Sequence, residues 1–224
     1  MSTQNPFTSN PVTDFGTVPY LEALEMQKSI VEAVRSGIFA NFLMILEHPP
    51  VYTAGRKTYE SSLNGVTAVN IDRGGDVTYH GPGQLVFYPI FRVGSERIDV
   101  RAFVKKIERT VMESLSELGF RPLTGEEPGI WIDGTERKKV CSIGMSIDRG
   151  ISYHGIAINY SREPLDGFMK IRPCGMDPSV MGSLDLERDV LKRSMLWSFR
   201  NNFHDFREVP AMDIERVIRD GKEA

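Results

Sequence analysis

Residues 129–159 read GIWIDGTERKKVCSIGMSIDRGISYHGIAIN, and their pattern decides the fold class. Three runs are rich in isoleucine, valine and other strand-forming residues: 129–132, 139–147 and 151–159. Asp133-Gly134 and Asp148-Arg149-Gly150 separate these runs and are typical of turns. The stretch therefore predicts consecutive antiparallel strands with no helix between them.

The second turn sets a register that brings two glycines together. If residues 148–150 form a three-residue loop, residues 142–144 lie beside residues 154–156. This arrangement places Gly144 and Gly155 side by side, where the missing side chains leave a shallow trough that could accept an extended ligand. A β-bulge or a close contact with a helix explains the same glycines equally well.

Apolar residues with helical spacing predict helices on both sides of the strands. The first helix begins near Tyr20 and ends before Gly37, where a glycine cap fits. The second begins at Asp99, a capping residue, and ends at Gly119. Two more helices are predicted near the C-terminus: one over residues 190–203, and one capped by Asp213 with Ile214, Val217 and Ile218 on its apolar face.

Strand-forming residues fill the gap between the first two helices, where no further helix is expected. Residues 39–47 and 51–53 predict two strands, and His48-Pro49-Pro50 favours a bend between them because proline cannot continue a helix. Strands thus cluster in the middle of the chain without regular strand-helix alternation. This order predicts an α+β domain with a mixed, largely antiparallel sheet flanked by helices.

Length and composition favour one globular domain. A chain of 224 residues with 41% hydrophobic content can bury one sizeable core. We expect a single domain over residues 17–220 and a polar tail over residues 1–16, which resembles no secretory signal. No apolar run reaches the length of a membrane span, and a net charge of -3 argues against a protein that coats nucleic acid. We therefore expect a cytoplasmic protein that binds neither membranes nor nucleic acid.

Basic residues still recur near the segments discussed below, so an acidic partner could dock beside them. A solvated basic rim is the alternative interpretation for any one of them. These residues are Arg56, Lys57, Arg73, Arg137, Lys138, Lys139, Lys170 and Arg172.

The two cysteines, too few for a disulfide framework, lie in different surroundings. Cys141 lies inside a strand-like run, where a buried thiol behaves as a small hydrophobic residue. Cys174 lies between Pro173, which stiffens the backbone, and Gly175, which lets another group come close. Cys174 is therefore better placed for nucleophilic attack.

A nucleophilic cysteine needs a neighbouring cation or base, because a thiol with an ordinary pKa of about 8.5 is mostly protonated at neutral pH. The candidates for this helper are His80, His154 and Lys139. An ammonium group beside the thiol favours the thiolate and can carry a proton after the thiolate has reacted. The sequence does not decide which candidate contacts Cys174.

Neither a metal site nor a nucleotide-phosphate loop is indicated. The histidines and cysteines form none of the patterns C-x-x-C, H-x-x-x-H or H-E-x-x-H. The glycine-rich stretch RGGDVTYHGPGQ, at residues 73–84, lacks the lysine of a phosphate-binding loop and precedes strand-forming residues instead of a helix. We expect neither a metal nor another cofactor.

Four ordered blocks carry a resemblance to a known family. They are LEHPPVYT at residues 46–53 followed by Gly55-Arg56; RGGDVTYHGPGQ at 73–84; GIW at 129–131 with KVCSIG at 139–144 and HGIAIN at 154–159; and Pro173-Cys174-Gly175. The second block is similar to the signature R-G-G-x-x-T-aromatic-H-x-x-G-Q at every fixed position. In these blocks the chain resembles the lipoyl(octanoyl) transferases, and only the segments before Gly16 and after Leu186 match nothing in the family.

The resemblance implies a fold similar to the catalytic domain of biotin and lipoate protein ligases. It also implies an acyltransferase that takes an octanoyl group from acyl carrier protein and places it on a lysine of a lipoyl domain. The acceptors would be lipoyl domains of 2-oxoacid dehydrogenases and the glycine cleavage H protein, in the first step of endogenous lipoate synthesis. No ATP would be required, because one thioester replaces another.

The resemblance further implies which residues act. In the family, the cysteine of the PCG motif carries the acyl group as a thioester, and the lysine before the S-x-G segment lowers the pKa of that cysteine. These roles fall on Cys174 and Lys139. The substrate-contacting segments map onto Arg73, Gly74, Gly75, Asp76, Val77, Thr78, Tyr79, His80, Ser142, Ile143, Gly144, Gly155, Ile156 and Ala157.

Three other functions stay open. An ATP-dependent lipoate or biotin ligase would activate a free acid and would need no nucleophilic cysteine. An amidotransferase would move the octanoyl group between two lipoyl domains, again through a cysteine. A non-catalytic module that docks an acyl carrier would form no covalent adduct.

Overall fold

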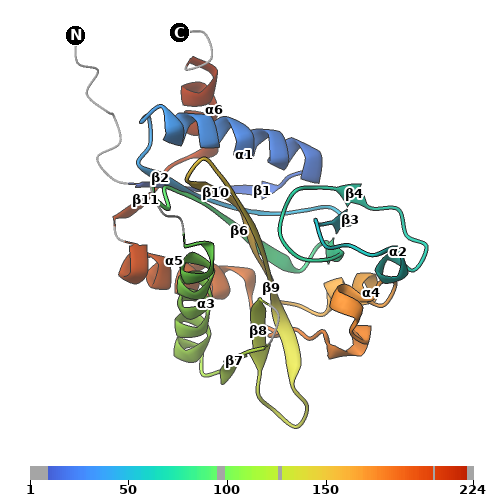
Figure 1. Ribbon diagram of the computed structural model, residues 1–224. Coiled ribbons are helices and arrows are strands. Elements are labelled where there is room, and N and C mark those ends of the chain that lie inside the picture. The colour runs from blue at the N-terminus through green and yellow to red at the C-terminus, as the bar shows by residue number, and fades with distance from the viewer. Residues whose placement is uncertain (1–9, 95–98, 126–127, 204, 221–224) are drawn as a thin grey trace, which may run out of the picture.

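An eight-stranded sheet forms the centre of the protein in the computed structural model, which describes residues 10–94, 99–125, 128–203 and 205–220 (Figure 1). Its strands are β1 (Asn10–Thr17), β2 (Asn41–Glu47), β6 (Gln84–Phe91), β7 (Pro122–Thr124), β8 (Gly129–Ile132), β9 (Lys138–Asp148), β10 (Ile151–Asn159) and β11 (Phe206–Glu208). They lie in the order β11-β1-β2-β6-β10-β9-β8-β7. β1 is parallel to β2 and β11, and every other neighbouring pair is antiparallel. The predicted α+β class with a mixed, largely antiparallel sheet is confirmed.

A second, three-stranded sheet lies beside the first. It contains β3 (Val51–Ala54), β4 (Val69–Asn70) and β5 (Thr78–His80), in the order β4-β3-β5. The helices are α1 (Tyr20–Arg35), α2 (Glu60–Leu63), α3 (Val100–Glu117), α4 (Glu163–Phe168), α5 (Arg188–Phe203) and α6 (Ala211–Asp220). No helix of the described residues is long and apolar enough to cross a membrane.

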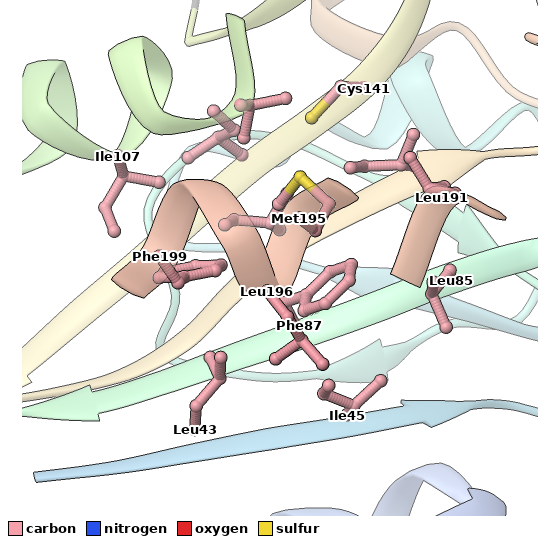
Figure 2. Close-up of a cluster of buried hydrophobic side chains, with 14 of the residues drawn as sticks. Leu43, Ile45, Leu85, Phe87, Ile107, Cys141, Leu191, Met195, Leu196 and Phe199 are labelled. Carbon is pink, nitrogen blue, oxygen red and sulfur yellow. The ribbon is translucent and has the colours of Figure 1, made fainter. Parts of the chain in front are cut away.

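Helices cover both faces of the large sheet. α1 and α6 lie on one face and α3 and α5 on the other (Figure 1). Two buried clusters fill the layers: one joins α1 and α6 to the sheet, and the other joins the sheet to α3 and α5. Figure 2 shows the second cluster, in which Phe87 of β6, Ile107 of α3 and Phe199 of α5 meet. The large sheet is thus the middle of three layers, and the small sheet and α4 lie at one end of it (Figure 1).

The helix boundaries confirm most of the predicted caps. The Asp99 carboxylate accepts a hydrogen bond from the backbone N–H of Ala102 at 2.9 Å, and Gly119 has a φ of 86° just beyond the end of α3. Two expectations were wrong. The short helix α2 lies between α1 and α3, and α6 begins at Ala211, so Asp213 lies within its first turn instead of capping it.

The N-terminal segment corrects the predicted domain boundary. The sequence predicts a polar tail over residues 1–16, but residues 10–16 belong to β1. Residues 1–9 lie outside the described residues. The buried residues of this strand are the consecutive Pro11, Val12 and Thr13, so the sequence shows no alternating apolar pattern there. Its polar positions are bound to neighbours: the Asp14 carboxylate accepts hydrogen bonds from Arg188 and Lys192 of α5.

The β9–β10 hairpin has a register one residue away from the predicted one. Arg149 and Gly150 have φ values of 46° and 85°, so they form a two-residue turn of the kind that matches the twist of a hairpin. Asp148 therefore pairs with Ile151, and Gly144 lies directly opposite Gly155. The three-residue loop was wrong, because Asp148 belongs to the strand.

The two facing glycines allow close approach of neighbouring segments, and both also line a cavity. A Cβ atom on Gly155 would lie 2.3 Å from the carbonyl oxygen of Phe87, on the neighbouring strand β6. A Cβ atom on Gly144 would lie 3.0 Å from Cδ of Arg73. The hairpin thus presents a surface on which β6 and the segment after Asp72 can pack.

We predict that Gly155→Ala destabilises the protein, because its methyl group would collide with backbone that cannot move alone. The expected loss in the free energy of unfolding is about 1–3 kcal/mol, measured as a lower midpoint in urea. Gly134→Ala is the matched control, since its Cβ would lie 3.6 Å from the carbonyl oxygen of Glu136, an ordinary contact distance. Equal midpoints for the two variants would contradict the close approach.

Candidate active site

A cavity of about 280 Å³ lies where β5, β9 and β10 meet the turn that carries Cys174. All of the predicted catalytic and substrate-binding residues line this cavity except Tyr79. They come from three separate parts of the chain: the loop and strand over residues 73–80, the facing segments of the β9–β10 hairpin, and the turn Pro173–Gly175. The tertiary structure thus gathers the segments that the sequence motifs singled out.

Tyr79 faces away from the cavity. Neighbouring residues of β5 point to opposite faces, and the ring of Tyr79 packs against Tyr52 and Phe168 at centroid distances of 5.1 and 5.8 Å. A Cβ atom on Gly167 would lie only 2.3 Å from this ring. The ring of Tyr79 is thus part of the packing beneath the small sheet, and its role as a substrate contact stays a prediction.

Cys174 is exposed and lies on a constrained turn. Its φ and ψ are 54° and 29°, in the left-handed region that non-glycine residues seldom adopt. The carboxylate of Asp76, which is 6% exposed, accepts a hydrogen bond from the backbone N–H of Cys174 at 3.0 Å. The same carboxylate accepts the N–H of Val77 at 2.6 Å. A buried acid thus ties the thiol-bearing turn to the RGG segment.

Cys141 lies in the core and has no part in the cavity wall. Figure 2 shows its sulfur among side chains of the α3–α5 layer, close to Met195. Burial raises the pKa of this thiol to about 12, although the charge of Lys139 acts in the opposite direction. The expectation that Cys141 is a structural residue agrees with this environment.

Lys139 reaches the cavity because of a β-bulge. Ile130 pairs with Cys141 but Trp131 pairs with Lys139, so Val140 is an extra residue in β9. Without the bulge, Lys139 and Cys141 would lie on one face of the strand. Lys139 is 5% exposed, and its side chain passes Gly129, where a Cβ atom would lie 2.6 Å from Cε.

The two histidines that were candidate helpers of the thiol are held neutral. Burial, together with the neighbouring His48, keeps the pKa of His80 well below its ordinary value. Burial also lowers the pKa of His154, although Asp72 opposes this shift. Because both imidazoles are neutral, neither can stabilise a thiolate by positive charge, and the role of Lys139 as the helper stays a prediction.

Arg73 is a second buried cation, 7% exposed, that sequence reasoning treated only as a binding residue. Its guanidinium donates hydrogen bonds to the carbonyl oxygen and hydroxyl of Thr53 at 2.9 and 3.0 Å. Burial lowers its pKa, while the charges of Asp76 and Cys174 are among those that oppose the shift. Arg73 and Cys174 line the same cavity, so the guanidinium is a second positive charge on the wall that carries the thiol.

Behind His80 lies an aromatic and histidine cluster that sequence reasoning missed. Tyr20 stacks on His80 at a centroid distance of 5.7 Å, and Tyr88 donates a hydrogen bond to Nε2 of His48 at 2.7 Å. Burial lowers the pKa of His48 to about 4, so this ring is neutral as well. In the sequence, His48 is marked only by its place in the motif block LEHPPVYT. The tyrosines of the cluster lie at scattered positions and form no local pattern.

Gln84, which closes the RGG motif block, has a structural task. Its side-chain oxygen accepts the Nδ1–H of His80 at 2.6 Å, and its amide nitrogen donates to Oδ1 of Asn159 at 2.9 Å. The first bond holds the ring of His80 to β6, and the second ties the Gln84 side chain to β10. Within the part of the chain that the structure describes, no group of three or more metal-ligating side chains comes together.

Comparison with known proteins identifies the family. The lipoyl protein ligase A/B catalytic domain family matches residues 19–196. The chain belongs to this family. An octanoyltransferase of Nocardia farcinica is 39% identical over 194 residues, which are 82% of this chain and 77% of that protein. An octanoyltransferase of Syntrophotalea carbinolica is 37% identical over 176 residues, which are 77% of this chain and 82% of the relative.

At this level of identity, the chain groups with the octanoyltransferases and is an acyltransferase enzyme. Solved structures show that the fold is that of the ligases. A bipartite lipoate protein ligase of Thermoplasma acidophilum superposes with a TM-score of 0.71 at 17% identity, covering 95% of this chain and 91% of the other. A biotin acetyl coenzyme A carboxylase synthetase of Helicobacter pylori gives 0.51 at 14% identity, with coverages of 87% and 75%. The predicted similarity to the biotin and lipoate ligase fold is confirmed.

We predict that iodoacetamide modifies Cys174 and spares Cys141 in the folded protein. Raising the pKa of a thiol from 9.0 to about 12 leaves it with about a thousandfold less thiolate, and Cys141 is fully buried as well. Intact mass should increase by one carbamidomethyl group in Cys141→Ala and by none in Cys174→Ala. Labelling of Cys174→Ala before unfolding would contradict these environments.

Proposed function

We propose that this enzyme transfers an octanoyl group from acyl carrier protein to a lysine of a lipoyl domain, through a thioester on Cys174. The observation that carries the proposal is the meeting, in one cavity, of an exposed thiol on a constrained turn and the buried ammonium of Lys139. Membership of the octanoyltransferase family supports the identity of the acyl group. The acceptors would be lipoyl domains of 2-oxoacid dehydrogenases and the glycine cleavage H protein.

In the first step, the Cys174 thiolate attacks the carbonyl carbon of the carrier thioester. A sulfur–carbon bond to Cys174 forms, the bond to the carrier sulfur breaks, and the carrier leaves as a thiolate that then takes up a proton. The bond that forms and the bond that breaks are of the same kind, so the step needs no ATP. Lys139 and Arg73 favour the attacking thiolate by their positive charge.

The oxyanion of this step requires donors other than the backbone of the nucleophile. The N–H of Cys174 is bound to Asp76, and the N–H groups of Gly175 and Met176 are bound to the carbonyl oxygens of Arg172 and Pro173. N–H groups of the β9–β10 hairpin, or the side chain of Lys139, are therefore better suited than the backbone of the Cys174 turn to stabilise the developing negative charge.

In the second step, the amine of the target lysine attacks the Cys174 thioester. A carbon–nitrogen bond forms, the bond to the Cys174 sulfur breaks, and the amine loses a proton. Once Cys174 is acylated, its sulfur no longer carries the negative charge that Lys139 balances, and Lys139 then acts as the base that accepts that proton. The two half-reactions predict ping-pong kinetics.

The surroundings of the cavity suit an acidic carrier. Arg56 and Lys57 line the opening, and Lys170 and Arg172 are exposed near the Cys174 turn. None of the four forms an ion pair within the described ranges, whereas Arg137 and Lys138 pair with acidic neighbours. Unpaired cations of this kind accelerate docking of an acidic partner in a salt-dependent way.

We predict that mixing the enzyme with octanoyl acyl carrier protein adds the mass of one octanoyl group. The adduct should form in Cys141→Ala and be absent in Cys174→Ala, because only Cys174 combines exposure with neighbouring cations. Intact mass spectrometry measures this directly. An adduct on Cys141, or none on the unmodified enzyme, would overturn the proposal.

We also predict that Lys139→Ala moves alkylation of Cys174 to higher pH, because removal of a buried ammonium weakens the preference for the thiolate. The matched control is Lys138→Ala, whose ammonium lies at the surface and pairs with Glu136 at 2.8 Å. The control should keep the profile of the unmodified protein. Identical profiles for both variants would remove the role assigned to Lys139.

The same experiments separate the alternatives. A ligase would retain much of its activity in Cys174→Ser and would depend on ATP. An amidotransferase would accept octanoyl lipoyl domain, and not octanoyl acyl carrier protein, as the donor. A docking module would bind the carrier without forming an adduct.

A further inference from the structure

Two residues of the cavity wall each keep a buried nitrogen without a hydrogen-bond partner. These atoms are Nδ1 of His154 and Nε of Arg73, and neither is paired within the described part of the chain. Both residues line the cavity. Most buried polar atoms in proteins are paired, because an unpaired one is costly. Two unpaired atoms of residues that line one cavity therefore indicate that polar groups of a bound ligand pair with them.

The contact with Asp72 makes the free nitrogen of His154 an acceptor. Oδ1 of Asp72 lies 3.0 Å from Nε2 of His154, and the hydroxyl of Tyr153 also donates to this carboxylate. These hydrogen bonds outweigh burial and lower the pKa of Asp72, so the ionised acid can only accept. The ring of His154 is therefore neutral with its hydrogen on Nε2, and Nδ1 presents a lone pair.

The backbone holds His154 in this place. Its φ is 55°, an uncommon value for a residue with a side chain, and its N–H donates to Oε1 of Gln27 at 2.8 Å. His154 is 1% exposed and directly precedes Gly155. Left-handed residues that are fixed in this way recur at binding sites, where the strain positions a side chain.

The free nitrogen of Arg73 is a donor on the same wall. Its two terminal nitrogens are already engaged, with Gly74 at 3.0 Å and with Thr53, which leaves the Nε–H. The aliphatic part of the side chain packs over Gly144, which pairs with Gly155 across the hairpin. Arg73 lies in the segment between β4 and β5, and His154 lies in β10, so a donor and an acceptor from two separate elements line one cavity.

We propose that Arg73 and His154 form a subsite for a secondary amide: Arg73 donates to the carbonyl oxygen, and the amide N–H donates to Nδ1 of His154. An ester has no N–H and a carboxylate can only accept, so neither satisfies both atoms. The inference rests on the proposed function, which offers two sources of such an amide. One is the amide-bearing arm of the acyl carrier, and the other is the peptide around the acceptor lysine.

The first arm of the test compares two donors of nearly equal length. Octanoyl-N-acetylcysteamine carries a secondary amide two carbons from sulfur, and S-pentyl thiooctanoate does not. The unmodified enzyme should acylate Cys174 about tenfold faster from the amide donor, and His154→Leu should abolish this preference. This outcome would assign the subsite to the carrier arm.

The second arm measures transfer from acylated enzyme to Nα-acetyl-lysine-amide or to pentylamine. A preference for the lysine compound that disappears in His154→Leu, with no donor preference in the first arm, would assign the subsite to the acceptor. His154→Asn is the matched variant, because asparagine tolerates a positive φ and keeps an acceptor near the position of Nδ1. It should retain most of the preference.

Should His154→Leu fail to fold, Asp72→Ala takes its place, because loss of the carboxylate frees the histidine to place its hydrogen on either nitrogen. The preference should then fall while alkylation of Cys174 by iodoacetamide stays unchanged. Equal rates for amide and amide-free compounds in both arms would overturn the subsite and leave the proposed function standing. The absence of any Cys174 adduct from octanoyl acyl carrier protein as well as from both small donors would overturn both.

Discussion

The structure depends on the close contact that Gly144 and Gly155 permit at the centre of the sheet. Because neither residue has a side chain, β6 can lie close to Gly155, and the aliphatic part of the Arg73 side chain can lie close to Gly144. The RGG segment then reaches the hairpin, and Gly74 donates a hydrogen bond to the carbonyl oxygen of Met145 at 3.0 Å. The RGG segment and the hairpin that meet here both line the cavity.

Cys174, the proposed nucleophile, is held by the same segment. Asp76 binds the backbone of Cys174, so the turn that carries the thiol is positioned by the RGG segment, which lies nearly a hundred residues earlier in the chain. The β-bulge at Val140 then brings Lys139 to the cavity and leaves Cys141 in the core. The extra residue in β9 thus places Lys139 at the cavity while Cys141 stays in the core.

Burial shapes the electrostatics of this cavity by keeping its histidines neutral. His48, His80 and His154 all have lowered pKa values, so they act as hydrogen-bonding groups near neutral pH, while Lys139 and Arg73 provide positive charge. Such a division suits thioester chemistry, in which a thiolate needs cations and a neutral acyl substrate needs hydrogen bonds.

The sequence by itself determined the fold class, the hairpins, the main helices and the motif segments that line the cavity, because these depend on local periodicity and on short ordered blocks. Only the tertiary structure decided the register, since a two-residue turn fixes it through the φ values of Arg149 and Gly150. It also turned Tyr79 away from the cavity, placed β1 in the sheet and assembled the cluster around His48. These features arise from contacts between residues far apart in the chain, which no local pattern records.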